Sequence, residues 1–197
     1  MSAFKFTFST QPLPPPPSLS TTFAIKANPS TDTWSKPPST HRFNAPILHK
    51  TGPLASFKRA SVHISAQWSN LYDQGGLILV LNYADGTKKW VKTGIEFVNG
   101  KPHVSTVAKD NWADWSLLEI PGGGGEAKIE MVREGNGLWV YLVEEGEGGK
   151  KAIREVTWAL VEEGVTEAWV GVYAARPAKE GGELVVEFKG LEVEFAE

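Results

Sequence analysis

The stretch GLILVLNYADGTKKWVKTGIEFVNGKPHVSTVA, residues 76–108, decides the fold class. Its first part, Gly76–Tyr83, is almost entirely apolar, which is typical of a central strand buried on both faces. The dipeptides Asp85-Gly86 and Asn99-Gly100 favour tight hairpin turns. We therefore expect antiparallel strands at Gly76–Tyr83, Lys89–Phe97 and His103–Ala108.

The same two-residue period extends to both sides of this stretch. In Phe57–Trp68, apolar Val62 and Ile64 alternate with polar His63 and Ser65. Further strands are expected at Ala127–Arg133, Gly137–Val143, Ile153–Leu160, Glu167–Ala175 and Gly182–Glu194. Many strands without a helical pattern, in a chain whose 197 residues fit one domain, predict an all-β sandwich or barrel.

The first thirty residues differ in composition from the rest of the chain. Pro12–Pro17 includes four consecutive prolines and is expected to be extended, as polyproline II. Apolar residues such as Phe6 and Phe23 flank this run. We therefore predict that residues 1–30 form an irregular, Pro-rich arm packed on the body, and that residues 31–197 form the β-sandwich domain. The alternative is that the arm binds a protein partner that accepts Pro-rich segments.

Charge and composition restrict the partners and the compartment. The net charge is −3 and the basic residues form no dense stripe, so nucleic-acid binding is not expected. No apolar run approaches the roughly 20 residues of a membrane span, and the N-terminus lacks the apolar run of a signal peptide. Since the absence of cysteine favours a reducing compartment, we predict a cytoplasmic protein that does not bind membranes.

The sequence lacks the usual motifs for metals and phosphates. Its four histidines have no metal-ligand spacing, and its five aspartates form no calcium-binding loop. The glycine run 122–125 precedes a predicted strand, so no helix N-terminus follows it to hold a phosphate. We therefore expect neither a metal nor a cofactor.

One face of the strand Lys89–Phe97 carries the candidate site. Alternation places Val91, Thr93, Ile95 and Phe97 toward the core. The opposite face then carries Trp90, Lys92, Gly94 and Glu96. Because Gly94 has no side chain, a slot is expected to open between the opposite charges of Lys92 and Glu96.

Aromatic and polar residues before and after this strand suit a sugar ligand. Tyr72, Gln74 and Trp115 belong to these clusters. An aromatic ring stacks on the C–H face of a sugar, while carboxylate, amide and ammonium groups bind its hydroxyls. This composition predicts a carbohydrate site. The alternative is that the charged side chains form an ordinary solvent-exposed row on the outer face of the sheet, without a binding role.

Three motifs resemble the domain-of-unknown-function family 1349, which has fungal members. They are Tyr72-Asp73-Gln74 with Gly76-Leu77, the strand Trp90–Phe97, and Asp114-Trp115-Ser116. The segments Trp34–Pro38 and Gly171–Pro177 are similar to fungal members as well. The resemblance covers residues 20–195 and implies a two-sheet antiparallel sandwich, a concanavalin A-like jelly roll of the lectin and glucanase type. It also marks signature positions, which are Tyr72, Asp73, Gln74, Trp90, Lys92, Glu96, Asp114, Trp115 and Arg176.

The first hypothesis for function is a lectin-like module that binds a small molecule or an oligosaccharide in a cleft on its concave sheet. The expected ligand-binding residues are Tyr72, Gln74, Trp90, Lys92, Glu96, His103, Trp115 and Arg176.

The second hypothesis is an enzyme, a hydrolase, lyase or isomerase, that acts on a sugar. Glu96 would be the acid/base, Asp73 or Asp114 the partner carboxylate, and Lys92 or Arg176 the group that stabilises charge. Glucanases of this fold place two glutamates two residues apart on one strand face, whereas this chain has Gly94 two residues before Glu96. That departure favours binding over catalysis.

A third hypothesis is a regulatory scaffold for proteins. It rests on the Pro-rich arm and on a yeast member of the family that is named for regulation of enolase, and so on fold-level analogy.

Overall fold

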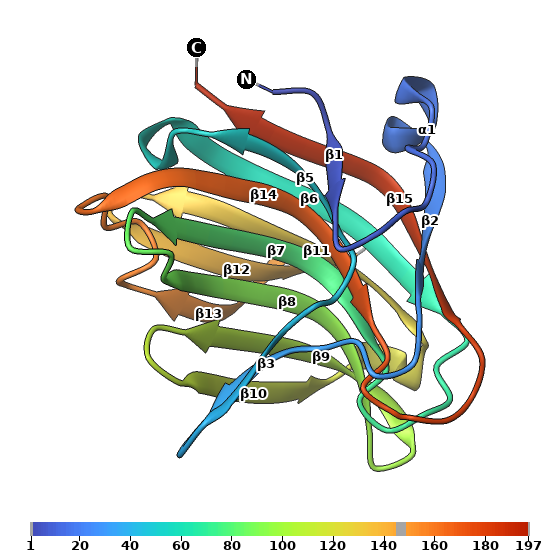
Figure 1. Ribbon diagram of the computed structural model, residues 1–197. Helices are drawn as coiled ribbons and strands as arrows, with labels where there is room; N and C mark the ends of the chain where they lie inside the picture. The colour runs from blue at the N-terminus through green and yellow to red at the C-terminus, as the bar shows by residue number, and fades with distance from the viewer. Residues whose placement is uncertain (1, 145–148, 197) are drawn as a thin grey trace.

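Two large antiparallel sheets pack face to face in the computed structural model, which describes residues 2–144 and 149–196 (Figure 1). The seven-stranded sheet consists, in spatial order, of β1 (Lys5–Thr7), β5 (Ile47–Gly52), β14 (Val165–Ala175), β7 (Gln74–Tyr83), β8 (Lys88–Val98), β9 (Lys101–Lys109) and β10 (Ala113–Glu119). The six-stranded sheet consists of β13 (Lys150–Val156), β12 (Gly137–Val143), β11 (Glu126–Glu134), β6 (Phe57–Ala66), β15 (Leu184–Phe195) and β2 (Thr22–Ala27). A separate hairpin is formed by β3 (Thr33–Lys36) and β4 (Thr40–Phe43). The fold is therefore the predicted two-sheet sandwich.

The strands predicted from the two-residue period are present, with ends that differ by a few residues. The main exception is the segment Ile153–Leu160, where β13 ends at Val156 because the chain turns, with the amide of Ala159 donating to the Val156 carbonyl. β10 is not among the strands expected from the sequence. It pairs with β9 along its whole length and forms one edge of the seven-stranded sheet.

The main core lies between the two sheets, and β8 shows how the sequence pattern directs side chains into it. Val91 and Ile95 are at most 1% exposed and belong to this core, as their alternation predicted. Thr93 faces the same way, and its buried hydroxyl forms a hydrogen bond with the Thr106 hydroxyl at 2.9 Å. Phe97, the fourth residue predicted on this face, is only partly buried.

The N-terminal thirty residues contribute strands to both sheets, which their irregular composition did not indicate. β1 pairs with β5, and β2 pairs with β15, so both are edge strands. The Pro-rich run is extended at Pro15 but then enters the short helix α1 (Pro16–Ser20), because proline is compatible with the first helical positions. Within residues 2–144 and 149–196, no helix has the length and apolar character needed to cross a bilayer.

The β3–β4 hairpin lies over the outer face of the seven-stranded sheet, where it crosses in front of β8–β10 (Figure 1). A second, smaller apolar cluster is formed there by Trp90, Ile78 and Tyr173, with Trp34 and Phe43 of the hairpin packed against it. The outer face of this sheet is therefore partly covered.

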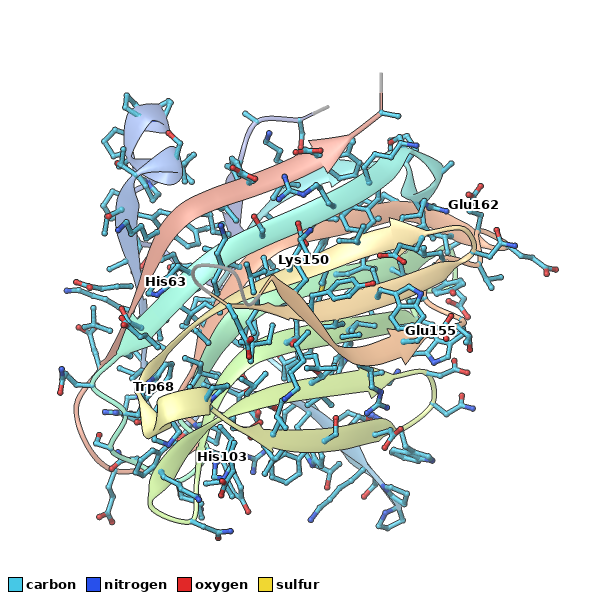
Figure 2. The ribbon with its side chains drawn as sticks, turned by 180° about the vertical axis from the view of Figure 1, so that it is seen from behind. His63, Trp68, His103, Lys150, Glu155 and Glu162 are labelled. Atoms are coloured by element: carbon cyan, nitrogen blue, oxygen red, sulfur yellow. The ribbon has the colours of Figure 1, made fainter. Side chains whose placement is uncertain are left out.

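The outer face of the six-stranded sheet carries a network of charges. Arg59 pairs with Glu192 at 2.7 Å and Glu194 at 2.6 Å, both more than half exposed, as on an ordinary solvated face. Glu130 is instead 1% exposed and is paired with Arg59 and with Lys150, which is labelled in the view from behind (Figure 2). Even on this face, a buried carboxylate has a cationic partner.

His49 gives stability a specific pH dependence. Its ring is buried on β5, stacks on Trp169 with centroids 4.5 Å apart, and meets the Thr7 hydroxyl at 2.9 Å. Burial is the main cause that lowers the pKa of His49 from 6.5 to about 4. Between these values the unfolded chain binds more protons than the folded protein, so stability falls as the pH is lowered through this window.

We expect wild type to lose about 2 kcal/mol more unfolding free energy between pH 7 and pH 5 than His49→Phe, which retains an aromatic ring without the titration. Urea denaturation at the two pH values measures this difference. Equal losses in both proteins would show that His49 does not titrate in this way.

Candidate functional site

A pocket of about 750 Å³ opens between the β3–β4 hairpin and the outer face of the seven-stranded sheet. This is a volume typical of small-molecule sites. The hairpin and the residue before it form one wall, and the segment before β7 forms another. Strands β7, β8 and β10 and the two residues Pro177 and Ala178 after β14 form the remaining surface. The lining residues are Asp32, Trp34, Lys36, Thr40, Arg42, Leu71, Tyr72, Gln74, Lys92, Glu96, Trp115, Pro177 and Ala178.

Lys92 is a deeply buried residue of this pocket, with 2% of its surface exposed. Its ammonium donates to the Gln74 side-chain oxygen, and it lies 5.7 Å from the ring centre of Trp90 and 5.6 Å from that of Tyr173. Aromatic faces attract a cation, and the amide oxygen accepts one of its three hydrogens. Burial lowers the pKa of Lys92, and the nearby Glu96 and Asp32 carboxylates oppose that shift.

Glu96 stands at the end of a hydrogen-bond chain. The Trp115 indole donates to the Ser105 hydroxyl at 3.0 Å, and this hydroxyl donates to the Glu96 carboxylate at 2.7 Å. Strand register produces the chain, because β8, β9 and β10 lie side by side and direct all three side chains to the outer face. Burial raises the pKa of Glu96, and Lys92 and Ser105 partly offset this.

Lys92 and Glu96 lie on the same face, as predicted, but they form no ion pair with each other. None of the ion pairs within 4.0 Å among the described residues joins them. Each is held by its own neutral neighbours, and both line the pocket. The two charged groups therefore line the pocket as separate groups.

Asp32 adds a second carboxylate to the pocket, from the segment that leads into the hairpin. Its backbone amide donates to the Asn44 side chain at 2.8 Å, and the Asn44 amide donates back to the Asp32 carbonyl at 3.0 Å, which closes the base of the hairpin. Its carboxylate accepts the Thr33 amide at 2.8 Å and lies 3.7 Å from the Arg42 guanidinium. Burial raises the pKa of Asp32, and the coulombic effect of Lys92 is the largest opposing cause.

Aromatic rings form the apolar part of the pocket wall. The ring of Trp115 meets Trp34 edge-on at 6.0 Å and Tyr72 edge-on at 6.1 Å. The tip of the hairpin is held in a similar way, since the His41 ring stacks on Trp112 with centroids 5.1 Å apart. These contacts join three segments that are distant in sequence around one opening.

The predicted residues Asp73 and Arg176 are brought together with each other and not into the pocket. Arg176 donates to both Asp73 oxygens, at 2.8 and 2.7 Å, and the pair is almost fully buried. Asp73 also accepts the amides of Ser69 and Asn70. The pair fixes the loop before β7 to the end of β14, and neither side chain lines the pocket.

The predicted residues Asp114, His103 and Trp90 also lie outside the pocket lining. Asp114 pairs with Arg154 of β13 at 2.6 Å and is 77% exposed, because its neighbour Trp115 takes the pocket side of the same strand. His103 lies opposite Glu96 in the sheet, and its ring meets the Lys101 carbonyl at 3.0 Å. Trp90 is 3% exposed beneath Lys92.

Tyr72, Gln74, Lys92, Glu96 and Trp115 are the predicted residues that line the pocket together. Residues of the hairpin were not predicted as site residues, namely Asp32, Trp34, Lys36, Thr40 and Arg42. The only signal for them was the similarity of Trp34–Pro38 to fungal family members. Within residues 2–144 and 149–196, no three His, Asp or Glu side chains converge as a metal site.

Two relatives align with this chain, one over most of its length and the other over part of it. An uncharacterized protein of Emericella nidulans is 60% identical over 176 residues, which cover 89% of this chain and 87% of the relative. The regulation of enolase protein 1 of Saccharomyces cerevisiae is 29% identical over 75 residues, 38% of this chain and 36% of that protein.

Several solved structures contain a β-sandwich similar to that of this protein. A functionally unknown protein from Saccharomyces cerevisiae has a TM-score of 0.77 at 20% identity, and the match covers 98% of this chain and 97% of the other. A Bacteroides ovatus xyloglucan PUL GH43B protein has a TM-score of 0.63 at 15% identity, over 88% of this chain and 32% of the other. The alginate lyase from Klebsiella pneumoniae has a TM-score of 0.54 at 13% identity, over 97% and 84%.

The fold therefore resembles modules found in carbohydrate-active proteins, and at these identities the likeness concerns the fold alone. The sequence gives a closer relationship. The model of the family described as "Protein of unknown function (DUF1349)" matches residues 14–196, so the chain belongs to the DUF1349 family.

Proposed function

We propose that the protein binds a small sugar or a sugar-derived metabolite in the pocket between the β3–β4 hairpin and the seven-stranded sheet. The observation that carries this proposal is the combination of aromatic and polar side chains that line the pocket. Trp34, Trp115 and Tyr72 offer ring faces and edges, while Gln74, Lys92 and Glu96 offer polar groups beside them. Sugars have both an apolar C–H face and a rim of hydroxyls, so they need both kinds of contact.

The polar groups of the pocket are positioned before a ligand arrives. Glu96 is fixed by Ser105, and Gln74 by Lys92 and by a donation to the Tyr72 carbonyl at 3.2 Å. Groups that are already ordered lose little conformational entropy on binding. The volume of about 750 Å³ suits a monosaccharide or disaccharide better than a long chain.

Trp115→Ala is expected to weaken sugar binding by about tenfold or more, because it removes both the ring surface and the indole that supports Ser105. Thermal shift is the first assay, with neutral monosaccharides and disaccharides, hexuronates and hexose phosphates, followed by calorimetry on each hit. The matched control is Trp139→Ala, a partly buried tryptophan on the six-stranded sheet. If no sugar binds wild type, or if Trp139→Ala weakens binding as much as Trp115→Ala, the proposal is wrong.

A second candidate is catalysis on the same sugar, and Asp32 is the observation that favours it. Asp32 and Glu96 line one pocket, and burial raises the pKa of both carboxyls. A carboxyl with a raised pKa is suited to general acid catalysis, and a second carboxylate supplies the base or nucleophile. Incubation of each bound sugar with wild type, Glu96→Gln and Asp32→Asn, followed by product analysis, tests this. Turnover by wild type that both variants lack would support an enzyme.

A further inference from the structure

Buried charges in the described part of the chain are generally paired with an opposite charge. Asp73 has Arg176 at 2.7 Å, and Glu130 has Arg59 at 2.8 Å and also Lys150. Asp32 has the longer contact with Arg42, at 3.7 Å. This is the expected arrangement, since a buried charge without a partner is costly.

Lys92 and Glu96, which are 2% and 6% exposed, depart from this arrangement, since none of the ion pairs found within 4.0 Å in residues 2–144 and 149–196 includes either residue. Of these two residues, Lys92 is the cation. Its one hydrogen-bond acceptor among these residues is the Gln74 amide, although an ammonium has three donors. The pocket lies on its free side, because Lys92 is one of the residues that line it.

The carboxylates of the pocket attract Lys92 from a distance, but neither forms an ion pair with it within 4.0 Å. Their hydrogen-bond donors lie elsewhere, since Ser105 donates to Glu96 and the Thr33 amide donates to Asp32. The remaining charged lining residues are the cations Lys36 and Arg42 of the hairpin, so three cations face two acids in this pocket. Arg42 is half exposed and lines the pocket, 3.7 Å from the Asp32 carboxylate.

We propose that the ligand of this pocket is an anionic sugar whose charged group lies against Lys92, with Arg42 and Lys36 attracting it at the entrance. This inference rests on the proposed function and names the class of sugar. The anionic oxygens belong either to a hexuronate carboxylate or to a hexose phosphate, and both would complete the charge pairing of Lys92. Gln74 and Glu96 then remain available for hydroxyl groups, and the aromatic wall for the C–H face.

Matched sugars that differ only in the anionic group test the proposal. Calorimetry at pH 7 compares D-glucose with D-glucuronate and D-glucose 6-phosphate, and D-galactose with D-galacturonate and D-galactose 6-phosphate. We expect at least one anionic sugar to bind about tenfold more tightly than its neutral parent, which corresponds to about 1.4 kcal/mol. Whether the hexuronate or the hexose phosphate binds more tightly identifies the anionic group as carboxylate or phosphate.

Lys92→Met retains most of the side-chain volume without the charge, and it should reduce the ratio of anionic to neutral affinity, measured within the variant itself, to less than about threefold. Lys109→Met, on the neighbouring strand β9 and outside the pocket lining, should keep the preference. Circular dichroism establishes that each variant folds, and Lys92→Gln replaces Lys92→Met if the latter does not. A wild-type ratio near one contradicts the proposal even without either variant.

Two outcomes would overturn the proposal in different ways. If neutral sugars bind wild type as tightly as their anionic counterparts, or if the preference survives in Lys92→Met, the charge assignment is wrong while sugar binding stands. If no member of either series binds, the proposed function itself is wrong. The same titrations therefore separate the failure of one claim from the failure of the other.

Discussion

Asp73→Ala is expected to lower the free energy of unfolding by about 3–5 kcal/mol. The substitution removes the counter-ion of Arg176 while the guanidinium stays buried at 5% exposure. It also leaves the amides of Ser69 and Asn70 without the acceptor that holds the loop before β7. Removal of one member of a buried pair costs more than the pair contributes, because an uncompensated charge remains.

Urea denaturation of Asp73→Ala measures this loss, and Asp114→Ala is the matched control. Asp114 also pairs with an arginine at short distance, Arg154 at 2.6 Å, but it is 77% exposed. An exposed pair is worth about 0–1 kcal/mol, so the control should lose no more than that. Adding Arg176→Met to Asp73→Ala should recover part of the stability, since it removes the unpaired charge. Similar losses in Asp73→Ala and Asp114→Ala would show that the buried pair is not structural.

Gly94→Ala is expected to destabilise the protein by at least about 4 kcal/mol or to prevent folding. Gly94 and Gly76 lie directly opposite each other on β8 and β7. A Cβ atom on Gly94 would lie 2.1 Å from the carbonyl oxygen of Gly75 and 2.5 Å from the Cα atom of Gly76. Both are backbone atoms of a central strand, so the sheet itself would have to move.

Gly182→Ala is the matched control for this substitution, because a Cβ atom there would have no neighbour within 4 Å. The control should change the unfolding free energy by less than about 1 kcal/mol. Far-ultraviolet circular dichroism and urea titration of both variants give the comparison. A Gly94→Ala protein as stable as Gly182→Ala would mean that the two strands do not approach each other so closely.

The face of β8 could be predicted from sequence because alternation is a local property. Trp90, Lys92 and Glu96 are separated by even numbers of residues, and all three do lie on the outer face. The same rule separates Asp114 from Trp115, since adjacent residues of a strand point to opposite faces. Because no strand was expected at Ala113–Glu119, nothing in the sequence pattern separated Asp114 from Glu96, although the two residues face different sides of the sheet.

The rest of the site depends on where the β3–β4 hairpin packs on the sheet, and the local sequence pattern does not predict this packing. Asp32, Trp34 and Arg42 reach the pocket because the β3–β4 hairpin crosses the outer face of a sheet formed mainly by later residues. Asp73 and Gln74 are adjacent in sequence, yet one is buried against Arg176 and the other lines the pocket. Only the packing of the loop on β14 distinguishes these two roles.

The indole N–H signals of the protein give the most direct test that a sugar binds beneath the hairpin. Each of the eight tryptophans contributes one indole N–H signal to a nitrogen-15 correlation spectrum, and Trp→Phe variants assign these signals. Titration with the panel sugar of largest thermal shift should move the signals of Trp34 and Trp115, which line the pocket. The signals of Trp139 and Trp158, outside that lining, should remain in place. If no sugar moves Trp34 or Trp115, or if only Trp139 and Trp158 respond, the pocket is not the sugar site.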